Sequence, residues 1–130
     1  MEENIAQFRF VNYQVVESEF RFDSKRKSNK KLNVTFERSV VVDDADSRMR
    51  LELVNTIEDE DKSLFLRVRM HGFFEFDPQI SDDMKGMFIR INAPAILFPY
   101  VRAYVSTLTS LSGIEPVILP TLNLSDRNAK

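Results

Sequence analysis

Residues 92–102 read Asn-Ala-Pro-Ala-Ile-Leu-Phe-Pro-Tyr-Val-Arg, and at this run strand-like sequence gives way to a helix. Each proline fixes φ and removes a backbone donor, so placing Pro99 five residues after Pro94 is unusual. We expect the main helix to begin near Pro94 to Pro99 and to run to Ser112, because Gly113 is a natural stop signal. Apolar residues recur there at three- and four-residue spacing, which predicts one stripe that packs on a sheet: Val101, Tyr104, Val105, Leu108 and Leu111.

Before this run, apolar and polar residues alternate, which predicts four β-strands. The first spans about Ala6 to Asp23, and two shifts in the phase of its apolar residues predict bulges or bends. The second carries Leu32, Val34 and Phe36 on one face, with polar residues between them. One face of this sheet should therefore be buried and the other wet.

The third and fourth predicted strands form a hairpin joined by the short, charged link 58–61, which we expect to be exposed to solvent. Asp77-Pro78 ends the strand region, because proline cannot donate to a ladder. From about Ile80 to Ile91 we expect a connector with a short helical turn. The predicted fold class is α+β, with a four-stranded antiparallel sheet packed by one main C-terminal helix.

Length and composition predict a single domain over residues 1–130. No stretch is long and apolar enough to span a bilayer, and the first residues lack a basic start followed by an apolar core. We therefore expect a cytoplasmic protein with no membrane insertion. The absence of cysteine rules out disulfides and thiolate metal sites, and a net charge of −2 gives no strong field for nucleic acid.

The predicted sheet has more apolar surface than one helix can cover. Four strands make a sheet about 20 Å wide, whereas a helix with its side chains covers about 10 to 12 Å. The chain has eleven Phe and three Tyr, and exposed surface of this kind indicates a partner, a ligand groove or oligomerisation. Phe65 and Phe73 fall on the opposite phase from the core residues, which predicts a second contact surface.

The proline-containing run resembles the signature of the SecB protein-export chaperone family. Seven positions match it: Pro94, Ile96, Leu97, Phe98, Pro99, Tyr100 and Arg102, whereas Ala95 and Val101 differ. The stretch Pro120-Thr121-Leu122-Asn123-Leu124 also fits the family. The resemblance implies a sheet-plus-helix fold that assembles as a dimer of dimers. It also implies an ATP-independent holdase that binds unfolded clients in grooves between helix and sheet and hands them to the SecA motor ATPase.

By position, the resemblance implies a client groove lined by seven residues: Leu32, Val34, Phe36, Tyr100, Tyr104, Leu108 and Leu111. Simple core packing is the alternative for each of them. Glu19 and Asp23 match the family's acidic motor-binding surface, but a further acidic position of that surface falls near Arg67. The family's second helix and acidic tail are also expected to be missing after Leu124. Both departures bear on SecA binding.

No other constellation in the sequence predicts chemistry, so we expect no enzyme activity, no metal and no cofactor. His71 is the only histidine, so we expect neither a Ser-His-Asp arrangement nor a two-histidine metal site. The acidic runs 43–46 and 58–61 lack the calcium-loop pattern, and three glycines leave no phosphate-binding loop. The basic run Lys25 to Lys31 is expected to be a charged connector and not a nucleic-acid site.

Two alternatives to an export holdase stay open at this point. One is a SecB-like chaperone dedicated to a toxin-antitoxin system. The other is a non-chaperone scaffold domain that uses the same apolar surface only to oligomerise, and it predicts no affinity for unfolded chains.

Overall fold

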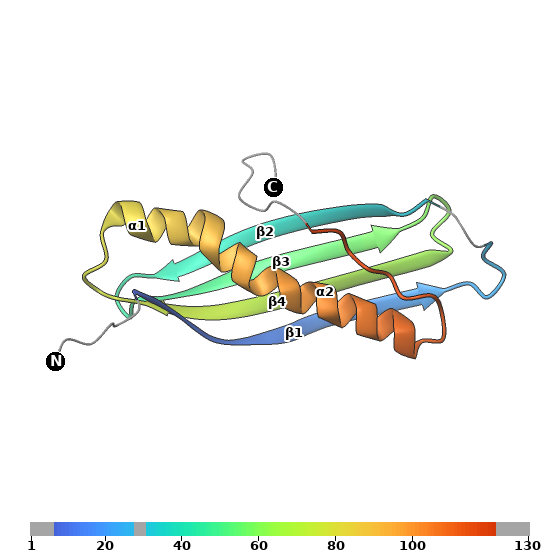
Figure 1. Cartoon of the computed structure of the whole chain (residues 1–130), viewed down its shortest axis with the longest axis horizontal. Helices are drawn as coiled ribbons and strands as arrows, with labels where there is room; N and C mark the ends of the chain where they lie inside the picture. Colours follow the sequence, from blue (N-terminus) through green and yellow to red (C-terminus); the bar gives the residue numbers. More distant parts are fainter. Residues whose placement is uncertain (1–6, 28–30, 122–130) are drawn as a thin grey trace.

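Four antiparallel strands form one sheet in the computed structural model, which describes residues 7–27 and 31–121 (Figure 1). The strands are β1 (Phe8–Phe22), β2 (Asn33–Asp43), β3 (Arg48–Glu58) and β4 (Leu64–Phe76), in the spatial order β1-β4-β3-β2. β1 and β2 are therefore the edge strands, and the predicted β3–β4 hairpin is confirmed. Residues 28–30 of the basic run and 122–124 of the second matching stretch lie outside the described residues.

β1 carries the two bulges that its apolar phase shifts predict. Its register against β4 skips one residue between Phe10 and Asn12 and another between Val15 and Glu17. Val11 and Val16 are the extra residues, and each bulge shifts the alternation by one position. As a result, three separate apolar runs of β1 all face the side of the sheet that the helices cover: Phe8 and Phe10, Tyr13 and Val15, and Phe20 and Phe22.

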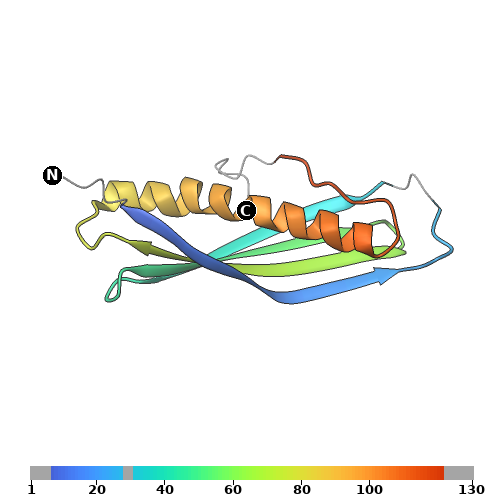
Figure 2. The ribbon, with the colours of Figure 1, turned by 60° about the horizontal axis from the view of Figure 1, so that its bottom comes forward.

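Three helical segments follow one another without a break: α1 (Asp82–Met87), the π-helix η1 (Phe88–Asn92) and α2 (Ala93–Leu111). They cover one face of the sheet and cross it diagonally from β2 towards β1, and the other face is bare within the described part of the chain (Figures 1 and 2). The expected connector with a short helical turn is thus mostly helix. Ser81 explains the early start, because its side chain accepts a hydrogen bond from the Met84 amide at 3.2 Å.

Pro94 accounts for the π-helical turn before α2. It has no N–H to donate to the carbonyl four residues earlier, which belongs to Arg90. Arg38 of β2 instead donates from Nη1 to this carbonyl oxygen at 3.2 Å, and the Ala93 amide donates to the Phe88 carbonyl, five residues back. By leaving the Arg90 carbonyl without a helical donor, Pro94 allows Arg38 to link the helical segments to the β2 edge of the sheet.

The buried stripe of α2 packs on the middle strands, β3 and β4. Its members advance in steps of four residues: Leu97, Val101, Val105 and Thr109. Thr109 therefore takes the inward position near the C-terminus. Leu111, which we expected in the stripe, is 82% exposed. A Cβ added at Gly72 of β4 would lie 3.0 Å from Leu97, so Leu97 of the helix packs directly on the part of β4 that has no side chain.

After α2 the chain turns back along the helix. Gly113, with a φ of 83°, ends α2 as predicted. Thr109 Oγ1 then accepts a hydrogen bond from the Val117 amide at 2.8 Å, and Arg102 Nε donates to the Leu119 carbonyl at 2.7 Å. Leu119 reaches the core and is 1% exposed. These contacts hold residues 114–119 as a return segment between α2 and the β2 side of the sheet (Figure 1).

Candidate functional site

A cavity of about 530 Å³ lies where the return segment crosses the end of the sheet. Four elements contribute to its walls: the ends of β1 and β4, the chain on either side of the β1–β2 connection, and the return segment. Two of its apolar residues remain open to solvent, since Phe22 is 38% exposed and Ile118 is 66% exposed. The cavity is lined by Phe22, Arg26, Leu32, Leu64, Gly113, Ile114, Glu115, Pro116, Val117 and Ile118.

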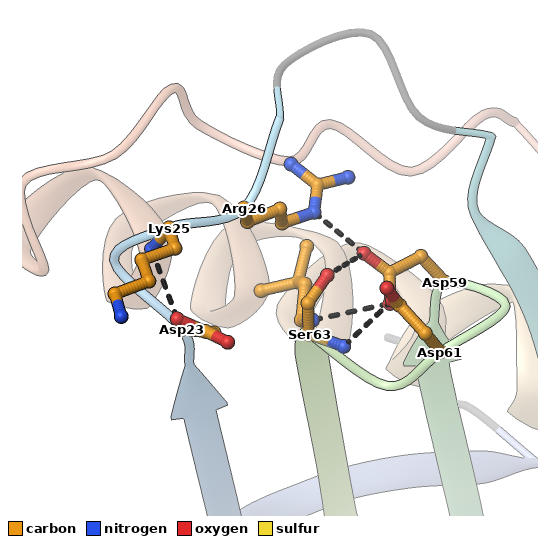
Figure 3. Close-up of polar contacts among 7 residues, drawn as sticks. Asp23, Lys25, Arg26, Asp59, Asp61 and Ser63 are labelled. Carbon is orange, nitrogen blue, oxygen red and sulfur yellow. Dashed lines mark hydrogen bonds and ion pairs between the residues drawn. The ribbon is translucent and has the colours of Figure 1, made fainter.

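A buried ion pair fixes one wall of this cavity (Figure 3). Arg26 Nε lies 2.6 Å from Asp59 Oδ2, and the Asp59 side chain is fully buried. Asp59 also accepts hydrogen bonds from the Ser63 hydroxyl at 2.6 Å and the Leu64 amide at 3.2 Å. The carboxylate thus joins the β1–β2 connection to the β3–β4 turn, and it holds Arg26 against the cavity.

The charge of Asp59 is stabilised by these partners. Burial on its own would raise the pKa of this carboxyl, but the hydrogen bonds from Ser63, Arg26 and the Leu64 amide outweigh burial and hold the pKa well below its ordinary range. Asp59 is 2% exposed, so the prediction of a wholly solvent-exposed link at 58–61 is wrong at this residue. One carboxylate of this acidic run is therefore structural. The only sign of this in the sequence is Ser63, four residues later, whose hydroxyl donates a hydrogen bond to Asp59.

Three of the seven predicted groove residues lie on the β2 side of α2. Leu32 lines the cavity. Val34 is 37% exposed, and Phe36 is half-buried with its ring edge-on to Phe98 of α2 at a centroid distance of 5.3 Å. These residues alternate along the edge strand, so they form a continuous apolar border that leads away from the cavity.

The other four lie on α2, and its two tyrosines face β1. The Tyr100 ring is 4.5 Å from the Tyr13 ring and 5.5 Å from the Phe10 ring, centroid to centroid. Tyr104 donates from its hydroxyl to Ser18 Oγ at 2.8 Å. Leu108 is half-buried, whereas Leu111 is largely exposed. The structure therefore divides the predicted set between the two sides of α2. Sequence reasoning did not place Tyr13, which is 42% exposed, beside Tyr100.

The two residues predicted for motor binding have different surroundings. Glu19 lies on the open face, where it pairs with Arg21 and stands opposite Arg67 in the ladder. Asp23 lies just past the end of β1, and its Oδ1 accepts a hydrogen bond from the Lys25 amide at 2.9 Å (Figure 3). Glu19 thus has two arginine neighbours, whereas the side chain of Asp23 stabilises the turn that follows β1.

Phe65 and Phe73 belong to the open face, as their phase predicts, but they differ in exposure. Phe65 is 6% exposed, because the guanidinium of Arg21 lies 4.4 Å from its ring centroid and that of Arg67 lies 5.6 Å away. Phe73 is half-buried. The expectation of a second contact surface therefore applies to the Phe73 end of the open face, since Phe65 is covered within the chain.

Further along the open face, His71 and Glu52 form a hydrogen-bonded pair. His71 Nε2 lies 2.9 Å from Glu52 Oε2, and this hydrogen bond, together with Arg69, holds the pKa of Glu52 below its ordinary value although burial acts the other way.

Across residues 7–27 and 31–121, no group of three His, Cys, Asp or Glu side chains is placed to hold a metal ion. No helix in the same ranges has the length and apolar character needed to cross a membrane.

The chain thus combines a four-stranded antiparallel sheet, one covering helix and a cavity at the edge of the sheet. The chain belongs to the SecB family, since the family model described as preprotein translocase subunit SecB matches residues 9–126. Members of this family are chaperones, and membership supports a chaperone role for this protein.

Similar proteins come from archaea and bacteria. An uncharacterised protein of Methanocaldococcus jannaschii, MJ0357, is 33% identical over 90% of this chain and 79% of its own length. The protein-export protein SecB of Orientia tsutsugamushi (strain Boryong) is 25% identical over 94% of this chain and 75% of its own length. Among solved structures, the Mycobacterium tuberculosis Rv1957 SecB-like chaperone, in complex with a ChAD peptide from the Rv1956 HigA1 antitoxin, shows the same fold. Its TM-score is 0.73 at 16% identity, with 89% of this chain and 88% of that chain covered.

Proposed function

We propose that this protein is an ATP-independent holdase of the cytoplasm that binds non-native polypeptides on the helix side of its sheet. The observation that most supports the proposal is the cavity of about 530 Å³ with exposed Phe22 and Ile118 on its walls. Large apolar side chains left open to water on an otherwise packed layer indicate a binding surface. The border of Leu32, Val34 and Phe36 extends this surface along β2, and Tyr100, Tyr104, Leu108 and Leu111 extend it on the β1 side of α2.

The size of the cavity argues for a client bound at several points. Burial of one Leu or Phe side chain contributes about 1.5 to 3 kcal/mol, whereas a micromolar site needs about 8 kcal/mol after binding costs. One cavity of this kind gives modest affinity. Several copies in a homo-oligomer, for which we propose a dimer of dimers, would present several such sites to one unfolded chain and raise its effective concentration.

The first test measures light scattering as a chemically denatured protein of unrelated sequence is diluted into buffer with stoichiometric amounts of the purified protein and no nucleotide. A holdase suppresses the scattering. A stable oligomer that leaves the scattering unchanged would instead support the scaffold alternative, in which contacts between copies consume the apolar surface.

We further propose handover of clients to the SecA motor through the open face that carries Glu19. Family membership supports this step, whereas the neighbouring Arg21 and Arg67 reduce the acidic character of that surface. The test is binding of purified SecA by sedimentation, with the wild type compared to the Glu19→Arg variant. Binding that the substitution abolishes supports handover, and the absence of binding by the wild type rejects it.

A second candidate is a chaperone dedicated to an antitoxin. It is supported by the fold shared with the Mycobacterium tuberculosis SecB-like chaperone, whose structure contains an antitoxin peptide. Binding confined to one partner encoded beside this protein, with no suppression of scattering for unrelated clients, would favour this role over general export.

A further inference from the structure

The open face of the sheet carries several arginines and, along the described strands, no lysine. Six arginines point to this face from β1, β3 and β4. Arginine is enriched and lysine depleted at protein–protein interfaces, because the planar guanidinium is weakly hydrated and binds carboxylates with two parallel hydrogen bonds. The six are Arg9, Arg21, Arg48, Arg50, Arg67 and Arg69.

Four of the six already have partners within the chain. Arg69 pairs with Glu17 at 3.0 Å and with Glu52 at 3.1 Å, and Arg9 pairs with Glu75 at 2.6 Å. Arg21 pairs with Glu19, and Arg21 and Arg67 both cover the ring of Phe65. Most of the open face is thus neutralised and covered by its own residues.

Arg48 and Arg50 of β3 are the exceptions. Both side chains are exposed, and neither forms an ion pair in the part of the chain that the structure describes. Arg50 stands directly between two apolar residues of the adjacent strands, Val41 of β2 and Phe73 of β4. Val41 is 55% exposed, and Phe73 is half-buried.

A second cavity lies beside these residues. Its volume is about 320 Å³, and it sits at the first bulge of β1, where Val11 is 42% exposed. Arg48 and Phe73 both line it, so an arginine and an aromatic residue border the same space. The bulge is what creates this room, because the extra residue bends β1 locally. The full lining is Val11, Asn12, Gln14, Arg48, Met49, Phe73, Phe74 and Glu75.

We propose that this arginine patch, defined as Val41, Arg48, Arg50, Phe73 and the adjoining cavity, docks an acidic segment of a partner protein. One apolar or aromatic side chain of that segment would occupy the cavity, and carboxylates beside it would pair with Arg48 and Arg50. The patch lies on the opposite face of the sheet from the proposed client surface, so the inference goes beyond the holdase function. A single partner of defined chemistry is expected here, because paired guanidinium groups select charge and geometry.

The neighbouring charges favour a short acidic peptide over a nucleic acid. Asp43 and Glu75 flank Arg48 in the ladder, and although Glu75 is paired with Arg9, the carboxylate of Asp43 would repel a continuous chain of phosphates. A peptide can place two or three carboxylates opposite the arginines and turn its other residues away. The apolar neighbours of Arg50 likewise match an amino-acid side chain better than a sugar-phosphate backbone.

The test uses a fluorescein-labelled peptide with one central tryptophan flanked by glutamates, and the same peptide with glutamine at each glutamate position. Fluorescence anisotropy reports binding to the whole protein at low and moderate salt. We expect the acidic peptide to bind more tightly than the amide peptide and to weaken as salt rises. Arg48→Gln/Arg50→Gln should weaken its binding about tenfold, since each exposed pair contributes about threefold. Phe73→Ala should weaken it as well.

Arg67→Gln at the covered end of the same face is the matched control and should leave peptide binding unchanged. Arg48→Gln/Arg50→Gln should also leave the suppression of scattering unchanged, which separates this proposal from the holdase function. Thermal unfolding checks that each variant is folded, and Arg48→Lys/Arg50→Lys, which keeps the charge, should restore part of the affinity. Equal binding of both peptides, or wild-type binding by the double glutamine variant, would overturn the proposal.

Discussion

Replacing two exposed apolar residues beside the larger cavity should weaken client binding about thirtyfold. The variant is Val34→Thr/Ile118→Ser, in which threonine keeps the β-branched shape that suits a strand. Complete burial of a Val or Ile side chain contributes about 2 kcal/mol. Val34 is 37% exposed and Ile118 is 66% exposed, so a client can still bury these fractions. They correspond to about 0.7 and 1.3 kcal/mol, or about 2 kcal/mol together, which is about thirtyfold in affinity.

Fluorescence anisotropy of a labelled, permanently unfolded polypeptide measures this affinity directly, and suppression of scattering provides an independent readout. The matched control is Val41→Thr, because Val41 lies on the same strand, is 55% exposed and faces the opposite side of the sheet. The control should bind the client as the wild type does. A folded double variant with wild-type affinity would refute the assignment of the client surface. Equal losses in the double variant and the control would refute the reasoning that only the helix side binds clients.

Three further outcomes follow from the same contacts. Asp59→Ala should lower the free energy of unfolding by about 3 kcal/mol, measured by denaturant titration, because it removes a fully buried carboxylate and leaves the partly buried Arg26 without its partner. The contribution of Asp59 should also depend on pH. Its folded-state pKa lies below the ordinary value of about 4, so the stabilisation is complete above that pH and is lost as the pH falls below it. Acid titration of the wild type should show this loss, and the Asp59→Ala variant should show a smaller one, which comes from groups such as Glu52 whose pKa is also lowered. Tyr13→Ser/Tyr100→Ser should weaken client binding without changing the sedimentation coefficient, whereas a lighter species would assign this pair of rings to contacts between copies.

Periodicity was sufficient to predict the strands, including both bulges of β1. The alternation of apolar and polar residues changes phase at Val11 and again at Val16, and a bulge is the backbone feature that absorbs such a change. The helical connector was harder to predict. Residues 82–92 contain no clean apolar stripe, because one side packs on the sheet through few residues such as Phe88, and a π-helical turn breaks the 3.6-residue period.

The candidate site was predicted by residue type but not by arrangement. Tyr104 was expected beside the second-strand residues, yet its hydroxyl bonds Ser18 on the opposite edge strand. The reason is the diagonal course of α2, which brings its later turns over β1, and a crossing angle cannot be read from the period of a single helix. Asp59 was missed for a related reason, since its partner Arg26 is thirty-three residues away in the sequence. Pairing across that distance depends on the finished sheet.

A sheet covered on one side only leaves two faces available, and the chain gives each face a different chemistry. On the helix side, Phe22, Val34 and Ile118 offer apolar burial, which has no preferred direction and accepts many sequences. On the open face, Arg48 and Arg50 offer charge in a fixed planar geometry, which discriminates between partners and loses strength in salt. Under the two proposals, clients that vary in sequence and a partner of constant chemistry therefore bind at the same time on opposite sides of β3. Competition between the acidic peptide and an unfolded client for one molecule of the protein would contradict this division, whereas independent binding of the two is expected from it.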